Sequence, residues 1–214
     1  MFRFKYDILE YQFKDIISDW LEVDNLITLH EFKQYKLFKR VDDQSSMWHK
    51  MFYNQIRIDS RFDDMYMRFL IEHVKPRYSE EIVYQKIPTF RVHLKNNISV
   101  GEWHKDKMYR NIAWSEKVNE INYYLPLTKA YGTNTVWAES EEDKGDFEPI
   151  DLDYGECAEW DASNLVHGNK VNRTSKTRVS IDFRVIPRSR YVGSDHLTIN
   201  AKIPFKIGEY YEVL

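Results

Sequence analysis

In the first part of the chain, hydrophobic residues recur at steps of three and four positions. One set comprises Leu9, Phe13, Ile16, Ile17, Trp20 and Leu21, and a second comprises Phe62, Met65, Tyr66, Phe69, Leu70 and Val74. This spacing puts each set on one face of an amphipathic helix. The second helix is expected to begin at Asp59 or Ser60 and to end around Lys75, because Pro76 disfavours helical geometry in the residue before it. Residues 47–58, between the two sets, are also predicted to be helical.

From about Ile82 the pattern changes to short segments rich in Val, Ile, Tyr, Phe and Thr, separated by Asn, Gly, Asp and Pro. This composition is typical of strands and turns. The predicted strands span residues 89–94, 99–104, 120–126, 134–139, 147–152, 157–161, 165–167 and 177–187. Short strands after a helical N-terminal part indicate an α+β, mainly β fold: a jelly roll whose outer sheet face is covered by the N-terminal helices.

The organisation of the chain indicates one domain. Its 214 residues contain no repeat, no low-complexity tract and no linker rich in Pro, Gly or Ser. This length suits a single domain with a sizeable core. We therefore predict one domain over residues 1–214, with a helical part (1–80), a β core (81–190) and an extension (191–214) that adds an edge strand or wraps the barrel. Nothing in the sequence indicates the oligomeric state.

Composition limits the kinds of partner. Lys and Arg number 31 against 34 Asp and Glu, and a net charge of −3 excludes the basic field that attracts nucleic acids and anionic membranes. No segment resembles a signal peptide or approaches the roughly 18 apolar residues of a membrane span. We therefore predict a cytoplasmic protein that acts on a small molecule. Cys157 is the only cysteine, which excludes an internal disulfide and a zinc–thiolate cluster.

Three residues have the chemistry of a metal site. His104 and Asp106 lie two positions apart, so a strand that continued to Asp106 would direct both side chains to one face. His167, on a distant predicted strand, supplies a third ligand. Two histidines and one carboxylate fill one face of an octahedral ion and leave the other positions open, which favours non-haem Fe(II). We predict that His104, Asp106 and His167 hold this metal and are the catalytic residues.

Arg178 lies 11 residues after His167, on the predicted strand over residues 177–187. Charged residues recur on one face of this strand. An arginine on an inward strand face is costly unless it meets an anion, and its guanidinium group suits a carboxylate. A dicarboxylate co-substrate would supply that anion. Ser180 shares the strand face of Arg178, so its hydroxyl group is expected to bind the same carboxylate.

The order His104-x-Asp106, His167, Arg178-x-Ser180 resembles the signature of the Fe(II)- and 2-oxoglutarate-dependent oxygenases, which have a double-stranded β-helix (cupin-like) fold. Segments 122–128, 139–140, 166–169 and 178–187 are similar to the StrG-like branch of that family, named for a protein of streptomycin biosynthesis. The likeness covers roughly residues 84–191.

The resemblance implies Fe(II), 2-oxoglutarate and O₂ as cofactor and co-substrates. It implies hydroxylation of a C–H bond in a small polar substrate, such as a sugar, an aminocyclitol or an amino acid, while 2-oxoglutarate is decarboxylated to succinate and CO₂. Relatives that halogenate have a small residue in place of the acidic ligand, so Asp106 disfavours halogenation.

Four further residues are candidates for binding. Asn122 and Tyr124 share a strand face, and in this fold the matching strand sends a polar side chain to the co-substrate. Arg91 either faces the cavity, where it would bind an anionic group of the substrate, or lies on the surface at a sheet edge. Trp137 either lines the cavity and contacts the substrate or belongs to the core.

Two other sets of charged residues are not expected to take part in the chemistry of the site. Asp182 and Arg184 continue the alternation of Arg178 and are expected to lie beyond the metal, paired or in solvent. The acidic segment 139–146 is most simply a solvated loop, and its alternative role is a lid that meets a cationic substrate.

Two other functions stay open at the level of sequence. A cupin-like metal-dependent isomerase or epimerase of sugars would use the three metal ligands without needing Arg178 and Ser180. In a non-catalytic, carbohydrate-binding β-sandwich, all of these residues would be incidental.

Overall fold

The computed structural model describes residues 1–32, 44–99, 102–109, 112–198 and 201–214. Its N-terminal part contains the three predicted helices, α1 (Phe13–Trp20), α2 (Met47–Gln55) and α3 (Ser60–Phe69). The side chain of Asp59 caps α3 by accepting a hydrogen bond from the backbone N–H of Arg61. Among the described residues, no helix has both the length and the apolar character needed to cross a bilayer.

The end of α3 differs from the prediction. The chain continues through a π-helical turn (Leu70–Val74) and a 3-10 turn (Lys75–Arg77) instead of leaving helical geometry at Lys75. Pro76 is tolerated because it lies in the first turn of the short 3-10 helix, where its missing N–H group has no intrahelical partner to lose.

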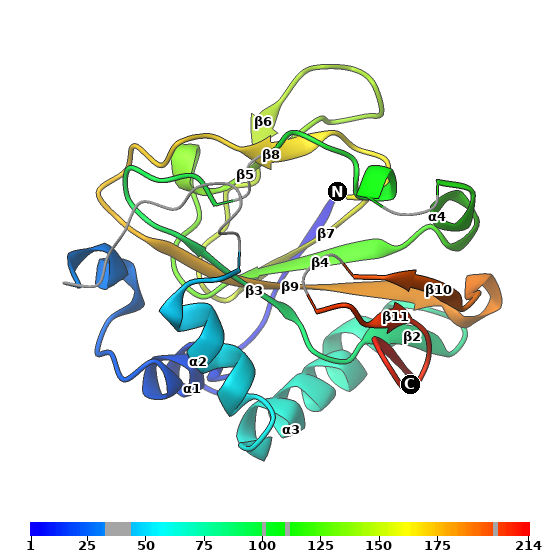
Figure 1. The fold of residues 1–214 in the computed structure, drawn as a ribbon, viewed down its shortest axis with the longest axis horizontal. Coiled ribbons are helices and arrows are strands. Elements are labelled where there is room, and N and C mark those ends of the chain that lie inside the picture. Colours follow the sequence, from blue (N-terminus) through cyan, green and yellow to red (C-terminus); the bar gives the residue numbers. More distant parts are fainter. Residues whose placement is uncertain (33–43, 100–101, 110–111, 199–200) are drawn as a thin grey trace.

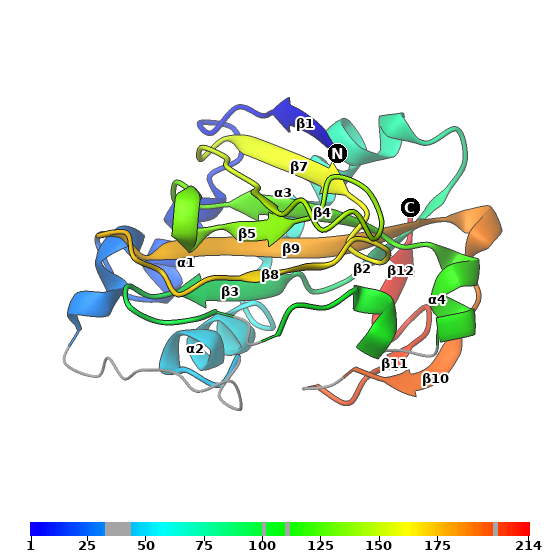
Figure 2. The same ribbon diagram turned by 90° about the horizontal axis from the view of Figure 1, so that it is seen from above.

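Within the described residues, seven strands form the main sheet, in which every pairing is antiparallel. Their order is β1, β7, β4, β9, β2, β12, and β3 also pairs with β9. Figure 2 shows β1, β7, β4, β9 and β3 crossing the molecule side by side. Their bounds are β1 (Phe2–Lys5), β2 (Ile82–Gln85), β3 (Thr89–His93), β4 (Ile121–Pro126), β7 (Glu156–Trp160), β9 (Arg178–Pro187) and β12 (Tyr211–Val213).

Smaller elements complete the fold. Strands β5 (Val136–Ala138), β6 (Glu148–Pro149) and β8 (His167–Asn169) form a second antiparallel sheet. Strands β10 (Ser194–Leu197) and β11 (Pro204–Phe205) pair with each other, and helix α4 (Ile112–Val118) lies at the same end of the molecule. The 3-10 turns η1 (Leu26–Glu31), η5 (Asp106–Tyr109), η6 (Gly132–Asn134) and η7 (Arg188–Arg190) lie in the connections.

The main sheet separates two layers. In Figure 1, α1, α2 and α3 lie on one side of this sheet, and β5, β6 and β8 lie on the other. Alternation along β9 matches this arrangement, because Val179, Ile181 and Phe183 belong to the large apolar cluster that includes the helices. The intervening residues of β9 therefore face the second sheet. The mainly β character of the fold is confirmed, and the sheets are antiparallel.

The predicted strand over residues 99–104 is wrong for the part that the structure describes. Only His104 makes a strand-like contact, an isolated bridge to His167, and residues 100–101 lie outside the described residues. Beyond this bridge the chain turns into η5, where the backbone N–H of Asp106 donates to the carbonyl of Ala162 at 3.0 Å. Hydrogen bonds to a loop therefore replace a strand ladder in this segment.

Candidate functional site

The site begins with the bridge between His104 and His167. The N–H group of each residue donates to the carbonyl group of the other at 2.9 Å. The two imidazole rings lie 4.4 Å apart between centroids. The backbone thus holds these two side chains next to each other, although they are far apart in the sequence.

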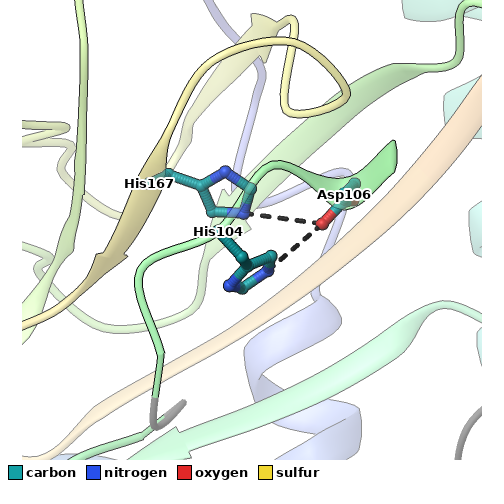
Figure 3. Close-up of side chains that lie close together, drawn as sticks. All are labelled: His104, Asp106 and His167. Carbon is teal, nitrogen blue, oxygen red and sulfur yellow. Dashed lines mark ion pairs between the residues drawn. The ribbon is translucent and has the colours of Figure 1, made fainter. Parts of the chain in front are cut away.

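Asp106 approaches the same point from η5 (Figure 3). Its Oδ1 atom lies 3.4 Å from Nε2 of His104 and 3.5 Å from Nε2 of His167. The three candidate ligand atoms all lie within 4.8 Å of one another. The structure therefore brings together the three predicted ligands, but it does so through a 3-10 turn and not through strand alternation.

The hydrogen bonds of both histidines fit a metal. Nδ1 of His104 donates to the carbonyl of Glu102 at 2.7 Å, and Nδ1 of His167 donates to the carbonyl of Leu165 at 3.0 Å. Because each Nδ1–H group is used on the backbone, Nε2 is the atom with a lone pair for an ion. Neighbouring ligands of an octahedral ion lie about 3 Å apart when metal–ligand distances are near 2.1 Å. These donors therefore need to move little to bind one cation.

The position of Arg184 differs from the prediction. It does not lie beyond the metal ligands, because its Nη2 atom donates to Oδ2 of Asp106 at 3.1 Å. Burial acts to raise the pKa of Asp106, but the net effect of its neighbours, led by the positive charge of Arg184, holds that pKa well below its usual range. Asp106 is therefore a carboxylate, which is the form that binds a cation.

Arg178 and Ser180 lie on the same face of β9 as Arg184, at the start of the strand. Arg178 is 1% exposed, and it donates from Nε to the carbonyl of Asn134 at 3.0 Å and from Nη1 to Oγ of Ser180 at 2.8 Å. In the part of the chain that the structure describes, no carboxylate forms an ion pair with Arg178. Burial lowers the pKa of this guanidinium group. A buried cation that has no carboxylate in direct contact is costly, and a bound carboxylate would relieve this cost.

Asn122 and Tyr124 lie on β4, opposite Arg184 and Asp182 of β9. Both are buried, and among the described residues neither Oδ1 of Asn122 nor the hydroxyl group of Tyr124 has a hydrogen-bond partner. The guanidinium carbon of Arg178 lies 5.9 Å from the centre of the Tyr124 ring. Buried polar atoms without partners are rare in folded proteins, and a bound ligand or an ordered water would satisfy these two groups.

The two predicted substrate contacts have different surroundings. Arg91 is opposite Ser180 on β3, and its Nε atom donates to Oδ1 of Asp182 at 3.4 Å, so it lies on the inner face and not on the outer surface. Val136 and Ala138 pack against the apolar cluster between the sheets, so Trp137 points the opposite way on β5. Nζ of Lys170 lies 3.1 Å from the centre of the Trp137 ring. Trp137 is therefore not brought to the metal ligands.

Sequence reasoning missed Glu120 and Trp160. Glu120 precedes β4 and is buried, and the hydroxyl group of Tyr211 donates to it. Burial raises the pKa of Glu120 to about 8, and Arg184 offsets this only partly. The indole ring of Trp160 packs edge-on against His167 at 4.9 Å, and its Nε1 atom is buried without a partner in the described structure. Glu120 lies two positions before Asn122, so a strand extended to residue 120 would direct both side chains to the same face. This spacing is the sequence signal that could have identified Glu120.

The acidic segment contacts the loop that carries Asp106. Glu142 accepts from Nζ of Lys105 and of Lys107, both at 2.9 Å, and Asp143 accepts from Lys105 at 2.6 Å. Lys105 and Lys107 flank Asp106 in the sequence. The negative charges of this loop are thus paired with lysines of the chain itself. This favours a surface loop over a lid that meets a cationic substrate.

Comparison with known proteins identifies the family. No family model matches the chain. Over 212 residues, the chain is 36% identical to the streptomycin biosynthesis protein StrG of Streptomyces griseus, which covers 99% of this chain and 98% of that protein. The chain belongs to the StrG family. The resemblance to the StrG-like branch is therefore confirmed.

Solved structures show the fold of this StrG-family chain. It is similar to a crystal structure of EctD from S. alaskensis with 2-oxoglutarate and 5-hydroxyectoine, with a TM-score of 0.50, 12% identity, and coverage of 97% of this chain and 76% of that one. A second similar structure is the apo form of the non-haem monooxygenase ThoJ, with a TM-score of 0.49, 14% identity, and coverage of 94% and 82%.

Proposed function

We propose that this StrG-family chain is an Fe(II)- and 2-oxoglutarate-dependent oxygenase with a double-stranded β-helix core, in which the main and second sheets enclose the site. The observation that carries the proposal is the pairing of two features on the inner side of the main sheet. His104, Asp106 and His167 converge on one point, and the buried Arg178 has no carboxylate partner among the described residues. Either feature alone would fit several kinds of site, but together they match a cation and a dicarboxylate.

In this proposal, one group of residues binds the metal and another binds the co-substrate. His104 and His167 would bind Fe(II) through Nε2 and Asp106 through Oδ1, and Arg178 with Ser180 would hold the distal carboxylate of 2-oxoglutarate. The hydroxyl group of Tyr124 and the amide of Asn122 offer further contacts to this co-substrate. When bound, the iron supplies the chemistry by which 2-oxoglutarate, O₂ and a substrate C–H group become succinate, CO₂ and C–OH.

The substrate would be small and polar. Arg91, Asp182 and Arg184 place charged groups on the inner face, where an apolar substrate would leave them poorly solvated. Hydrogen bonds to hydroxyl or amino groups would compensate for that burial. A sugar, an aminocyclitol or an amino acid has such groups, and the name of the relative StrG points to antibiotic biosynthesis.

An anaerobic titration tests the proposal. Purified protein receives Fe(II) and then 2-oxoglutarate, and the weak visible charge-transfer band of the chelate is measured. Asp106→Ala, treated in the same way, is the matched control and is expected to give no band. A wild-type protein that binds Fe(II) but gives no band with 2-oxoglutarate would favour the isomerase alternative. A wild-type protein that binds neither would favour the non-catalytic one.

A further inference from the structure

The two oxygen atoms of Asp106 have different partners. Oδ1 faces Nε2 of both His104 and His167, at 3.4 and 3.5 Å, whereas Oδ2 accepts a hydrogen bond from Nη2 of Arg184 at 3.1 Å. A carboxylate can bind a metal through one oxygen or through both. The hydrogen bond to Oδ2 favours binding through Oδ1 alone.

Arg184 is itself held firmly. Its Nη1 atom donates to Oδ2 of Asp182 at 2.9 Å, to Oγ1 of Thr89 at 3.1 Å and to Oε1 of Gln85 at 3.3 Å. The residue is 8% exposed and lies on β9, whose backbone pairs with β2, β3 and β4. The guanidinium group therefore has a position that does not depend on Asp106.

Asp106 has less support of its own. It lies at the start of η5, a turn of four residues, and its backbone is tied to the loop at Ala162. A ligand on such a turn gains most from an outer partner that fixes its side chain. Arg184 also places positive charge near the cation, but the 2.9 Å contact with Asp182 offsets that charge.

We infer that Arg184 is a positioning residue that fixes the carboxylate of Asp106 as a one-oxygen ligand. This inference rests on the function proposed above. Its effect is to keep one more coordination position open for the co-substrates. Arg178 and Arg184 then have separate tasks on one strand face, since Arg178 serves the dicarboxylate and Arg184 serves the metal ligand.

Cobalt(II) binding tests the inference without turnover. Co(II) is added to the apoprotein under anaerobic conditions, and its affinity and the shape of its d–d absorption band are measured. Arg184→Met is expected to bind Co(II) about 10- to 100-fold more weakly than the wild type and with an altered band. Arg184→Lys keeps the charge but loses the fork that reaches both Asp106 and Asp182, so its loss is expected to be intermediate.

The matched control is Arg178→Met, which removes a buried arginine from the same face of β9. It is expected to change Co(II) affinity by less than about threefold, because Arg178 donates to Asn134 and Ser180 and not to Asp106. Circular dichroism gives the folded fraction of each variant. If Arg184→Met does not fold, Arg184→Lys and Asp182→Asn decide the matter, since Asp182→Asn loosens Arg184 without removing it and is expected to weaken Co(II) binding less.

The outcomes separate this inference from the proposed function. A wild-type protein that fails to bind Co(II) overturns the proposed metal site itself. If the wild type binds and the folded variants of Arg184 and Asp182 keep its affinity and band, only the positioning role is wrong. Tighter binding by Arg184→Met would also overturn it, because the repulsion between Arg184 and the cation would then outweigh the orientation of Asp106.

Discussion

His104 and His167 are joined through their backbones, since each donates its N–H group to the carbonyl of the other at 2.9 Å. The side chains can therefore be changed without removing the hydrogen bonds that place them. His167→Ala is expected to abolish stoichiometric metal binding while lowering the thermal midpoint by only a few degrees, about what a loss of 1 kcal/mol produces in a domain of this size. Metal content after reconstitution and thermal unfolding measure the two effects.

The control for this variant is His196→Ala. His196 is an exposed residue of β10, outside the candidate site, and its replacement is expected to leave metal content unchanged. Full metal content in His167→Ala would contradict the role assigned to His167.

Arg178→Met is expected to weaken the binding of 2-oxoglutarate by about 100-fold, because truncating one partner of a buried charge pair costs roughly 2–5 kcal/mol. Isothermal titration of the Co(II)-loaded protein with 2-oxoglutarate measures this loss. Retained affinity for 2-oxoglutarate together with a large loss of stability would show that Arg178 serves the fold and not a ligand.

Tyr124→Phe removes a buried hydroxyl group that has no partner among the described residues. In the apoprotein this change is expected to leave stability unchanged or to raise it slightly, since an unsatisfied polar group is removed. Affinity for 2-oxoglutarate is expected to fall by about 5- to 10-fold, the effect of one hydrogen bond of roughly 1 kcal/mol. Equal affinity in both proteins would exclude a contact between this hydroxyl group and the co-substrate.

Glu120 gives the protein a specific pH dependence. Its pKa is raised to about 8 by burial, so between about pH 5 and pH 8 the folded state keeps a proton that the unfolded chain releases. Stability from this group therefore falls as the pH rises through that window, by at most about 1.4 kcal/mol per pH unit, and levels off above it.

Glu120→Gln cannot titrate but can still accept the hydrogen bond from Tyr211. The variant is expected to lose this fall in stability, as measured by urea unfolding at pH 6 and at pH 8. The same decline in wild type and variant would assign the pH dependence to other groups.

Phe52 of α2 stacks on Phe90 of β3, with ring centroids 4.5 Å apart and an interplanar angle of 6°. Both side chains are fully buried, so the contact fastens the helical layer to the main sheet. Phe52→Ala is expected to cost about 3–5 kcal/mol of unfolding free energy. Ile58→Ala, at a residue that is 79% exposed, is the control and is expected to change it by less than about 0.5 kcal/mol. Similar values for both variants would contradict this packing role.

Local patterns were sufficient for the parts of the fold that carry their own periodicity. The helical spacing over residues 9–21 and the cap at Asp59 depend on residues close in sequence, and the structure has α1 and α3 there, although Leu9 precedes α1 and is 79% exposed. The alternation of β9 likewise predicted two faces, one apolar and one charged. Strand β1 was missed because Phe2–Lys5 is too short to establish a period, and its pairing with β7 depends on residues far along the chain.

The three candidate metal ligands were chosen from residue type and order, and the structure brings them together. The route by which Asp106 reaches the histidines was not predictable from alternation, because it depends on carbonyl groups of a loop near Ala162. The sequence likewise showed a charged face on β9 but not which of its members meets Asp106.

The sequence by itself determined the three N-terminal helices, most strands of the β core, the likeness to the StrG branch and the set of residues able to bind a metal, because these depend on local spacing and residue chemistry. Tertiary structure alone decided that Arg184 meets Asp106, that Glu120 is buried beside Tyr211 and that Trp137 points away. These facts depend on which surfaces the chain brings together, and the charge and solvation of a side chain follow from its neighbours in space.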